Sequence, residues 1–152
     1  MLGFHKVFLL VLLFSGIAFA QSREETMMYI TQEIKALESD EFTITELKFS
    51  ENGKNFIYKS YLKGHGERAL SFTLDSVEFY PVTHKDSAGP KHYSLVVECR
   101  GKKEAILVNG SRFQRSTTIL DQSANRVKVK GLAKAFNHLA SLVAGRTTPF
   151  QG

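Results

Sequence analysis

Two histidines and an aspartate are the side chains of this sequence best suited to metal or acid–base chemistry. His84 and His92 flank a segment rich in proline and glycine, and Asp86 lies between them. Imidazole and carboxylate groups bind divalent cations, and imidazole exchanges protons near neutral pH. If the three side chains converge, they predict a metal site or the centre of a small hydrolase. The alternative is that they are solvated loop residues, and we favour it because loop histidines usually bind no ligand.

The other motifs of the chain do not support catalysis. His65 lies in a predicted glycine turn, and His138 lies beside the apolar face of a predicted helix. No two histidines have the H-x-H or H-E-x-x-H spacing of metal ligands. The chain has neither a G-x-S-x-G serine motif nor a glycine-rich phosphate loop. We therefore expect no catalytic residue, no cofactor and no metal site.

Three tyrosines form a second group of candidate surface residues. Tyr58, Tyr61 and Tyr80 lie in strand-like segments with lysines nearby. If these rings are exposed, they would stack on sugars or peptides. The alternative is that they pack in the core and against neighbouring strands, as most aromatic side chains of a sheet do.

The first twenty residues have the parts of a secretory signal peptide. Lys6 supplies a positive charge, Val7 to Phe14 form an apolar run, and Ala18-Phe19-Ala20 forms an A-x-A cleavage pattern. The alternative is a membrane anchor, but the apolar run is shorter than the ~20 residues that span a membrane. Gln21 follows the cut where lipid attachment would need a cysteine. We predict cleavage near Ala20 and a secreted or periplasmic protein without a transmembrane segment.

Charge is unevenly distributed along the rest of the chain. Residues 21–51 include three basic and eight acidic residues, whereas residues 52–152 include sixteen basic and seven acidic residues. The basic part would favour an anionic envelope component as a partner, although ordinary solubility charge explains it equally well. Export and the lack of a basic run with interleaved aromatic residues exclude nucleic acid. Cys99 is the only cysteine, so no disulfide can form within the chain, and its alternation with apolar residues predicts a core position.

Hydrophobic periodicity predicts the order helix, six or seven strands, helix. Ser22 is expected to cap a first helix at 24–39, and a last helix is predicted at 125–144. Asn52-Gly53 and Asn109-Gly110 predict tight turns, and Pro81–Lys91 is predicted to be the longest loop. One domain covers residues 21–146, followed by a tail at 147–152. The predicted strands cover 42–49, 55–63, 70–79, 93–100, 104–108 and 112–120, with phase slips near 45–46 and 75–76 that indicate bulges.

This element order indicates an α+β fold, with mainly antiparallel strands in a bent sheet and a C-terminal helix that covers it. The order resembles a pleckstrin-homology-like barrel over residues 42–144. The alternative is an open sheet with both helices on one face. The segment from Ala133 to Leu139 is also similar to the A-K-A-x-x-H-L closing helix of small exported bacterial domains of unknown function. That resemblance implies no particular activity.

The sequence favours a non-catalytic binding or interaction module outside the cytoplasm. Export, a single small domain and the lack of a catalytic motif support this interpretation. A protein, a peptide or an anionic envelope component would contact the Pro81–Lys91 loop or an open sheet edge. Two alternatives stay open. One is a small exported hydrolase built on His84, Asp86 and His92, and the other is a protein held at the envelope surface by its basic charge.

Overall fold

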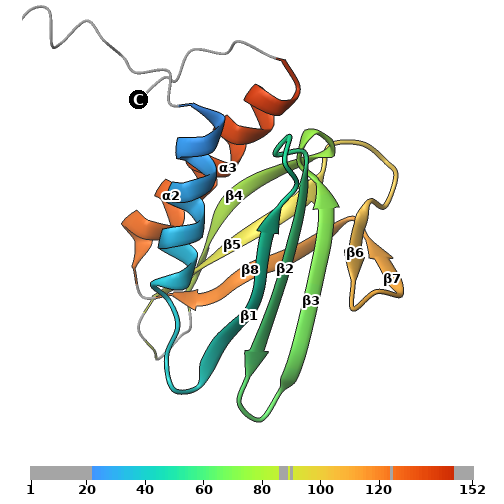
Figure 1. Cartoon of the computed structure of the whole chain (residues 1–152). Helices are drawn as coiled ribbons and strands as arrows, with labels where there is room; N and C mark the ends of the chain where they lie inside the picture. The colour runs from blue at the N-terminus through green and yellow to red at the C-terminus, as the bar shows by residue number, and fades with distance from the viewer. Residues whose placement is uncertain (1–21, 86–88, 90, 124, 146–152) are drawn as a thin grey trace, which may run out of the picture.

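The computed structural model describes residues 22–145 of the 152-residue chain, apart from residues 86–88, 90 and 124. The described residues form an N-terminal helix, eight antiparallel strands and a C-terminal helix, which confirms the predicted α+β class (Figure 1). The elements are α2 (Arg23–Lys35), β1 (Phe42–Phe49), β2 (Asn55–Leu62), β3 (Gly66–Thr73), the 3-10 turn η1 (Leu74–Ser76), β4 (Val77–His84), β5 (His92–Cys99), β6 (Ile106–Val108), β7 (Arg112–Gln114), β8 (Ser116–Ser123) and α3 (Arg126–Val143).

The strands form two separate sheets, which are not closed into a barrel. One sheet has the order β1-β2-β3-β6-β7 and the other has the order β4-β5-β8. The chain leaves the first sheet at η1, where a short helical turn takes the place of the bulge expected near 75–76. It changes sheet again at Arg115, which divides the predicted strand 112–120 into β7 and β8. Each break in the extended backbone lets the next strand pair with a different neighbour.

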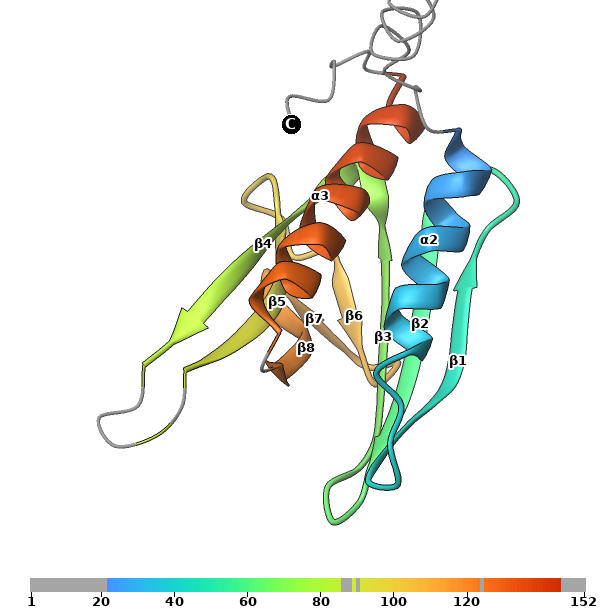
Figure 2. The same cartoon turned by 90° about the vertical axis from the view of Figure 1, so that its left-hand side faces the viewer.

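Both helices lie side by side and cover one side of the sheets (Figure 2). Helix α3 packs against β4, β5 and η1, whereas α2 packs against α3 and β1. Ser22 caps α2 as expected: its hydroxyl accepts from the Glu25 N–H at 3.1 Å, and its own N–H donates to the Glu25 carboxylate at 2.9 Å. Helix α2 ends at Lys35, before the predicted residue 39, because the backbones of Ser39 and Phe42 pair and turn the chain into β1.

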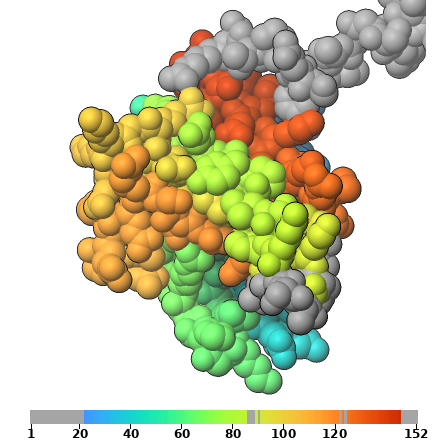
Figure 3. Space-filling model, turned by 180° about the vertical axis from the view of Figure 1, so that it is seen from behind, coloured from blue at the N-terminus to red at the C-terminus, as the bar shows by residue number. Residues whose placement is uncertain are grey.

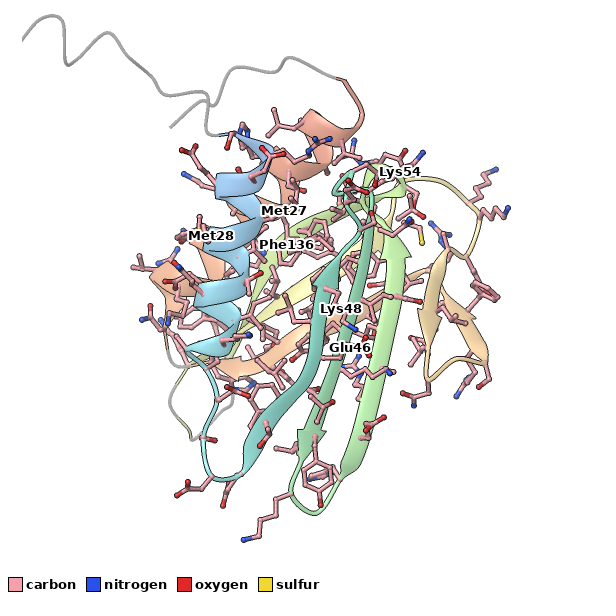
Figure 4. All side chains as sticks on the ribbon, in the orientation of Figure 1. Met27, Met28, Glu46, Lys48, Lys54 and Phe136 are labelled. Carbon is pink, nitrogen blue, oxygen red and sulfur yellow. The ribbon has the colours of Figure 1, made fainter. Side chains whose placement is uncertain are left out.

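A cluster of phenylalanines joins α3 to both sheets. Phe136 of α3 stacks on Phe79 of β4 with ring centroids 4.4 Å apart, and it meets Phe56 of β2 edge-on at 5.4 Å. Figure 4 shows Phe136 between the helices and the strands. The neighbouring Asn137 accepts from the Phe79 N–H at 3.0 Å and donates to the Phe79 carbonyl at 2.7 Å. Because β4 is an edge strand, these bonds satisfy backbone groups that no strand pairs.

The β4–β5 hairpin continues through the first part of the predicted Pro81–Lys91 loop, and that prediction is wrong for residues 81–84. Pro81 pairs with Leu95, and His84 pairs with His92. The backbone groups of Phe79 point away from β5 toward Asn137, and those of Pro81 point the same way two residues later. The missing N–H of Pro81 therefore removes no hydrogen bond between β4 and β5.

Candidate metal centre

His84 and His92 lie opposite each other at the open end of the β4–β5 hairpin. They are a cross-strand pair, so their side chains leave the same face of the sheet. The two half-buried rings stack with centroids 4.7 Å apart and an interplanar angle of 12°. Figure 3 shows the molecule from behind, where β4 (light green) lies between α3 (red-orange) and the orange segments of the chain.

Asp121 completes a three-residue cluster. It belongs to β8, which pairs with β5 next to the hairpin. One ligand atom from each of His84, His92 and Asp121 lies within 4.8 Å of the other two. Three adjacent strands thus bring two imidazoles and one carboxylate to the same place. The spacing of residues in the sequence does not predict that Asp121 joins the two histidines, because only strand pairing brings it there.

Ser94 connects two members of this cluster from the interior of the sheet. Its side chain is only 1% exposed. Its hydroxyl donates to Oδ1 of Asp121 at 2.6 Å, and its Oγ lies 3.0 Å from Nε2 of His84. An ionised carboxylate only accepts hydrogen bonds, so the single hydroxyl hydrogen of Ser94 is used on Asp121. Nε2 of His84 must then carry a hydrogen, which leaves the lone pair of the neutral ring on Nδ1.

The same hydrogen bonds distinguish this cluster from a serine-hydrolase triad. In a triad the histidine removes the serine hydrogen, and the aspartate holds the other ring nitrogen of the histidine. Here the hydroxyl of Ser94 points to Asp121, and the serine is buried below the two other side chains. Ser94 therefore orients His84 and Asp121 instead of attacking a substrate.

The residue types and spacing fit a transition-metal ion. Two imidazoles and one carboxylate are the ligand types that zinc and its neighbours in the periodic table accept, whereas calcium and magnesium prefer oxygen ligands only. Ligand atoms about 2.0–2.1 Å from a tetrahedral zinc lie about 3.4 Å apart. The observed limit of 4.8 Å is wider than this spacing, so the three ligand atoms would have to move closer together to hold the ion. Ser94 provides the outer hydrogen bond that commonly fixes such ligands.

The other predicted site residues have different outcomes. Asp86 lies outside the described residues. Tyr58 is completely buried, so its interpretation as a surface residue is wrong. Side chains alternate between the two faces of β2, and Phe56, Tyr58 and Ser60 lie on the inward face. Tyr61 lies on the opposite face of β2 and is 47% exposed. The hydroxyl of Tyr80 donates to Glu98 at 2.7 Å, and this hydrogen bond raises the pKa of Tyr80.

A shallow depression of about 490 Å³ lies on the outer face of the larger sheet, away from the cluster. Three of the charged side chains that line the depression form ion pairs with one another. The carboxylate of Glu46 pairs with Lys48 at 2.8 Å and with Lys59 at 2.7 Å, and Figure 4 shows Glu46 beside Lys48. The hydrogen bonds from Lys48 and then Lys59 lower the pKa of Glu46 to about 2. Thr45, Glu46, Leu47, Lys48, Lys59 and Glu67 line this depression.

Comparison with family models, with curated proteins and with solved structures found no significant match for this sequence. The cluster is therefore interpreted from its own geometry. Among the described helices, none is long and apolar enough to cross a membrane.

Proposed function

We propose that this chain is an exported binding module that takes up a divalent transition-metal ion, with zinc as the preferred ion. The ligands are His84, His92 and Asp121. The observation that carries this proposal is the convergence of two imidazoles and a carboxylate from three adjacent strands to within 4.8 Å. Such a site exists only in the folded chain, because strand pairing alone brings the three residues together.

Ser94 has a defined part in this function. Its hydroxyl holds the carboxylate of Asp121 and the Nε2 side of His84, so both ligands are oriented before the ion arrives. An ordered ligand set loses little side-chain entropy on binding, which favours affinity. Ser94 is a positioning residue, since its own oxygen is already engaged by the two ligands.

Calorimetric titration of the purified protein with zinc chloride tests the proposal. We expect one zinc ion per chain and at least a roughly 100-fold weaker association in His92→Ala, because a lost ligand costs more than the 10–100-fold of a lost outer hydrogen bond. His65→Ala is the matched control, because His65 is exposed in the turn between β2 and β3. Equal zinc binding by His92→Ala and by the unaltered protein would rule out this site.

Export is the second part of the proposal, and the start of the fold supports it. Helix α2 begins at Arg23, and Ser22 and Glu25 form the two halves of its cap. Cleavage after Ala20 would therefore leave the cap complete. When the full chain is expressed in a bacterium, we expect the periplasm or medium to contain a shorter protein. Its mass should equal that of a chain whose first residue is Gln21. Ala20→Arg should prevent cleavage. Recovery of only the uncleaved chain from the cytoplasm would contradict export.

A further inference from the structure

A row of mostly apolar side chains crosses the outer face of the larger sheet, from β2 to β7. Each member is the direct cross-strand neighbour of the next, so all of them leave the same face. The row consists of Ile57, Ser71, Leu107 and Phe113. Phe113 is 59% exposed and Ile57 is 38% exposed. Figure 1 shows β6 and β7 beside β3, away from both helices. The Phe113 end of the row is therefore open to a partner.

The segment that contains Phe113 is strongly basic. Residues 100–115 include five basic residues and one acidic residue, Glu104, so their net charge is +4. The loop before β6 and the residue after β7 lie at the same end of the β6–β7 hairpin, because Ile106 pairs with Gln114. The ion pairs formed by the described residues include none of the five basic side chains. These exposed residues are Arg100, Lys102, Lys103, Arg112 and Arg115.

Basic residues elsewhere on the surface have acidic neighbours. Lys128 of α3 pairs with Glu33 of α2 at 3.4 Å. On the outer face of the larger sheet, Lys48 and Lys59 both pair with Glu46. The positive charge of residues 100–115 is balanced only by Glu104 within the segment. An exposed aromatic ring and unbalanced positive charge thus occur together at the β6–β7 hairpin.

We propose that the β6–β7 hairpin docks on an anionic phospholipid surface. Phe113 and Leu107 enter the boundary between head groups and acyl chains, and the basic side chains of residues 100–115 contact the phosphates. Buried apolar area and attraction to anionic lipids together set the strength of such binding. An acidic polysaccharide would match the charge, but it offers no apolar region to Leu107 and Ile57. The proposed zinc ligands belong to the other sheet, so either proposal can fail without the other.

A single tryptophan tests where the protein meets the lipid. The chain contains no tryptophan, so Phe113→Trp introduces one fluorescent reporter at the proposed contact. The full chain is mixed with vesicles of phosphatidylglycerol and phosphatidylcholine, or of phosphatidylcholine alone, with EDTA present to remove zinc. We expect a blue shift of the emission, and quenching by brominated acyl chains, with the anionic vesicles only.

Val127→Trp is the control, because Val127 is an apolar residue of α3 that is 80% exposed. Its emission should stay unchanged with both kinds of vesicle. Residues 1–20 are the same in both variants, so contact of this segment with the vesicles does not produce a difference between them. No shift in Phe113→Trp, or an equal shift with neutral vesicles, would overturn the proposal. A shift with dextran sulfate and none with vesicles would make a polysaccharide the partner instead.

Two pairs of charge reversals, each added to Phe113→Trp, test the electrostatic part. Each basic residue near an anionic membrane strengthens binding by a factor of about five. Arg112→Glu/Arg115→Glu should therefore weaken vesicle binding by at least roughly 25-fold. Arg126→Glu/Lys130→Glu changes the net charge equally at exposed positions of α3 and should weaken binding less than about threefold, because salt screens distant charges. Equal losses in the two double variants would mean that net charge alone attracts the protein, and the docking surface would be wrong.

Discussion

Replacing Phe136 with alanine lowers the free energy of unfolding by about 3–5 kcal/mol, which is a large share of the stability of a domain of this size. Phe136 is 0% exposed and touches aromatic rings of both sheets, including Phe56 and Phe79. Its removal leaves a cavity where α3 joins the two sheets. The two sheets share no strand pairing, so side-chain packing of this kind holds them together.

Urea unfolding followed by circular dichroism measures this effect. Val127→Ala is the control on the same helix, since Val127 is 80% exposed and its truncation should change the free energy of unfolding by less than about 0.5 kcal/mol. A loss below about 1 kcal/mol in Phe136→Ala would mean that this ring is not enclosed by the core.

Zinc at a hundredfold excess over its dissociation constant raises the free energy of unfolding by about 2.7 kcal/mol. The reason is that His84, His92 and Asp121 meet only when β4, β5 and β8 are paired. The unfolded chain does not present this ligand set, so the ion stabilises the folded state selectively. For a domain of this length the corresponding rise in melting temperature is roughly 5–10 °C. Differential scanning calorimetry with and without zinc measures it.

The double variant His84→Ala/His92→Ala should show no zinc-dependent rise in melting temperature. Ser94→Ala should keep the rise but require about 10–100-fold more zinc to reach it, because only the outer hydrogen bonds are lost. Calcium chloride serves as the ion control, since calcium prefers oxygen ligands. The same rise in the double variant would assign the stabilisation to other zinc-binding groups.

The features that depend on local sequence were predictable. Ser22 caps the first helix as predicted, and Asn125, at the predicted start of the last helix, accepts from the Lys128 N–H at 3.0 Å. The turn at Asn109-Gly110 is confirmed, with φ angles of 51° and 69° that Asn and Gly accept at low cost. The slip at 45–46 is a register shift between Ile44 and Glu46. Each depends on a few consecutive residues, so it can be predicted without the fold.

The arrangement of the strands in space was less predictable. Periodicity identifies a strand but does not determine its neighbour, and an 8-residue strand such as β4 looks the same in a barrel or an open sheet. Pro81 suggested a loop because proline has no backbone N–H to donate to a neighbouring strand. A proline is acceptable in β4 only because β4 lies at the edge of its sheet.

The candidate site shows the same limit. His84 and His92 were recognised as a pair, but their contact follows from a register that continues past Pro81. Asp121 and Ser94 come from strands whose order in the sheet is a long-range property. The burial of Tyr58 depends on the phase of β2 relative to helices and strands elsewhere in the chain. None of these follows from residue type and spacing alone.

A crystal structure of the zinc-loaded protein, with diffraction measured on both sides of the zinc absorption edge, tests the central claim most directly. We predict one anomalous peak at the end of the β4–β5 hairpin, about 2 Å from a nitrogen of His84, a nitrogen of His92 and an oxygen of Asp121. Ser94 should keep its hydrogen bond to Asp121. A peak at His65, at His138 or at a contact between molecules, with none between the two stacked histidines, would contradict the metal site.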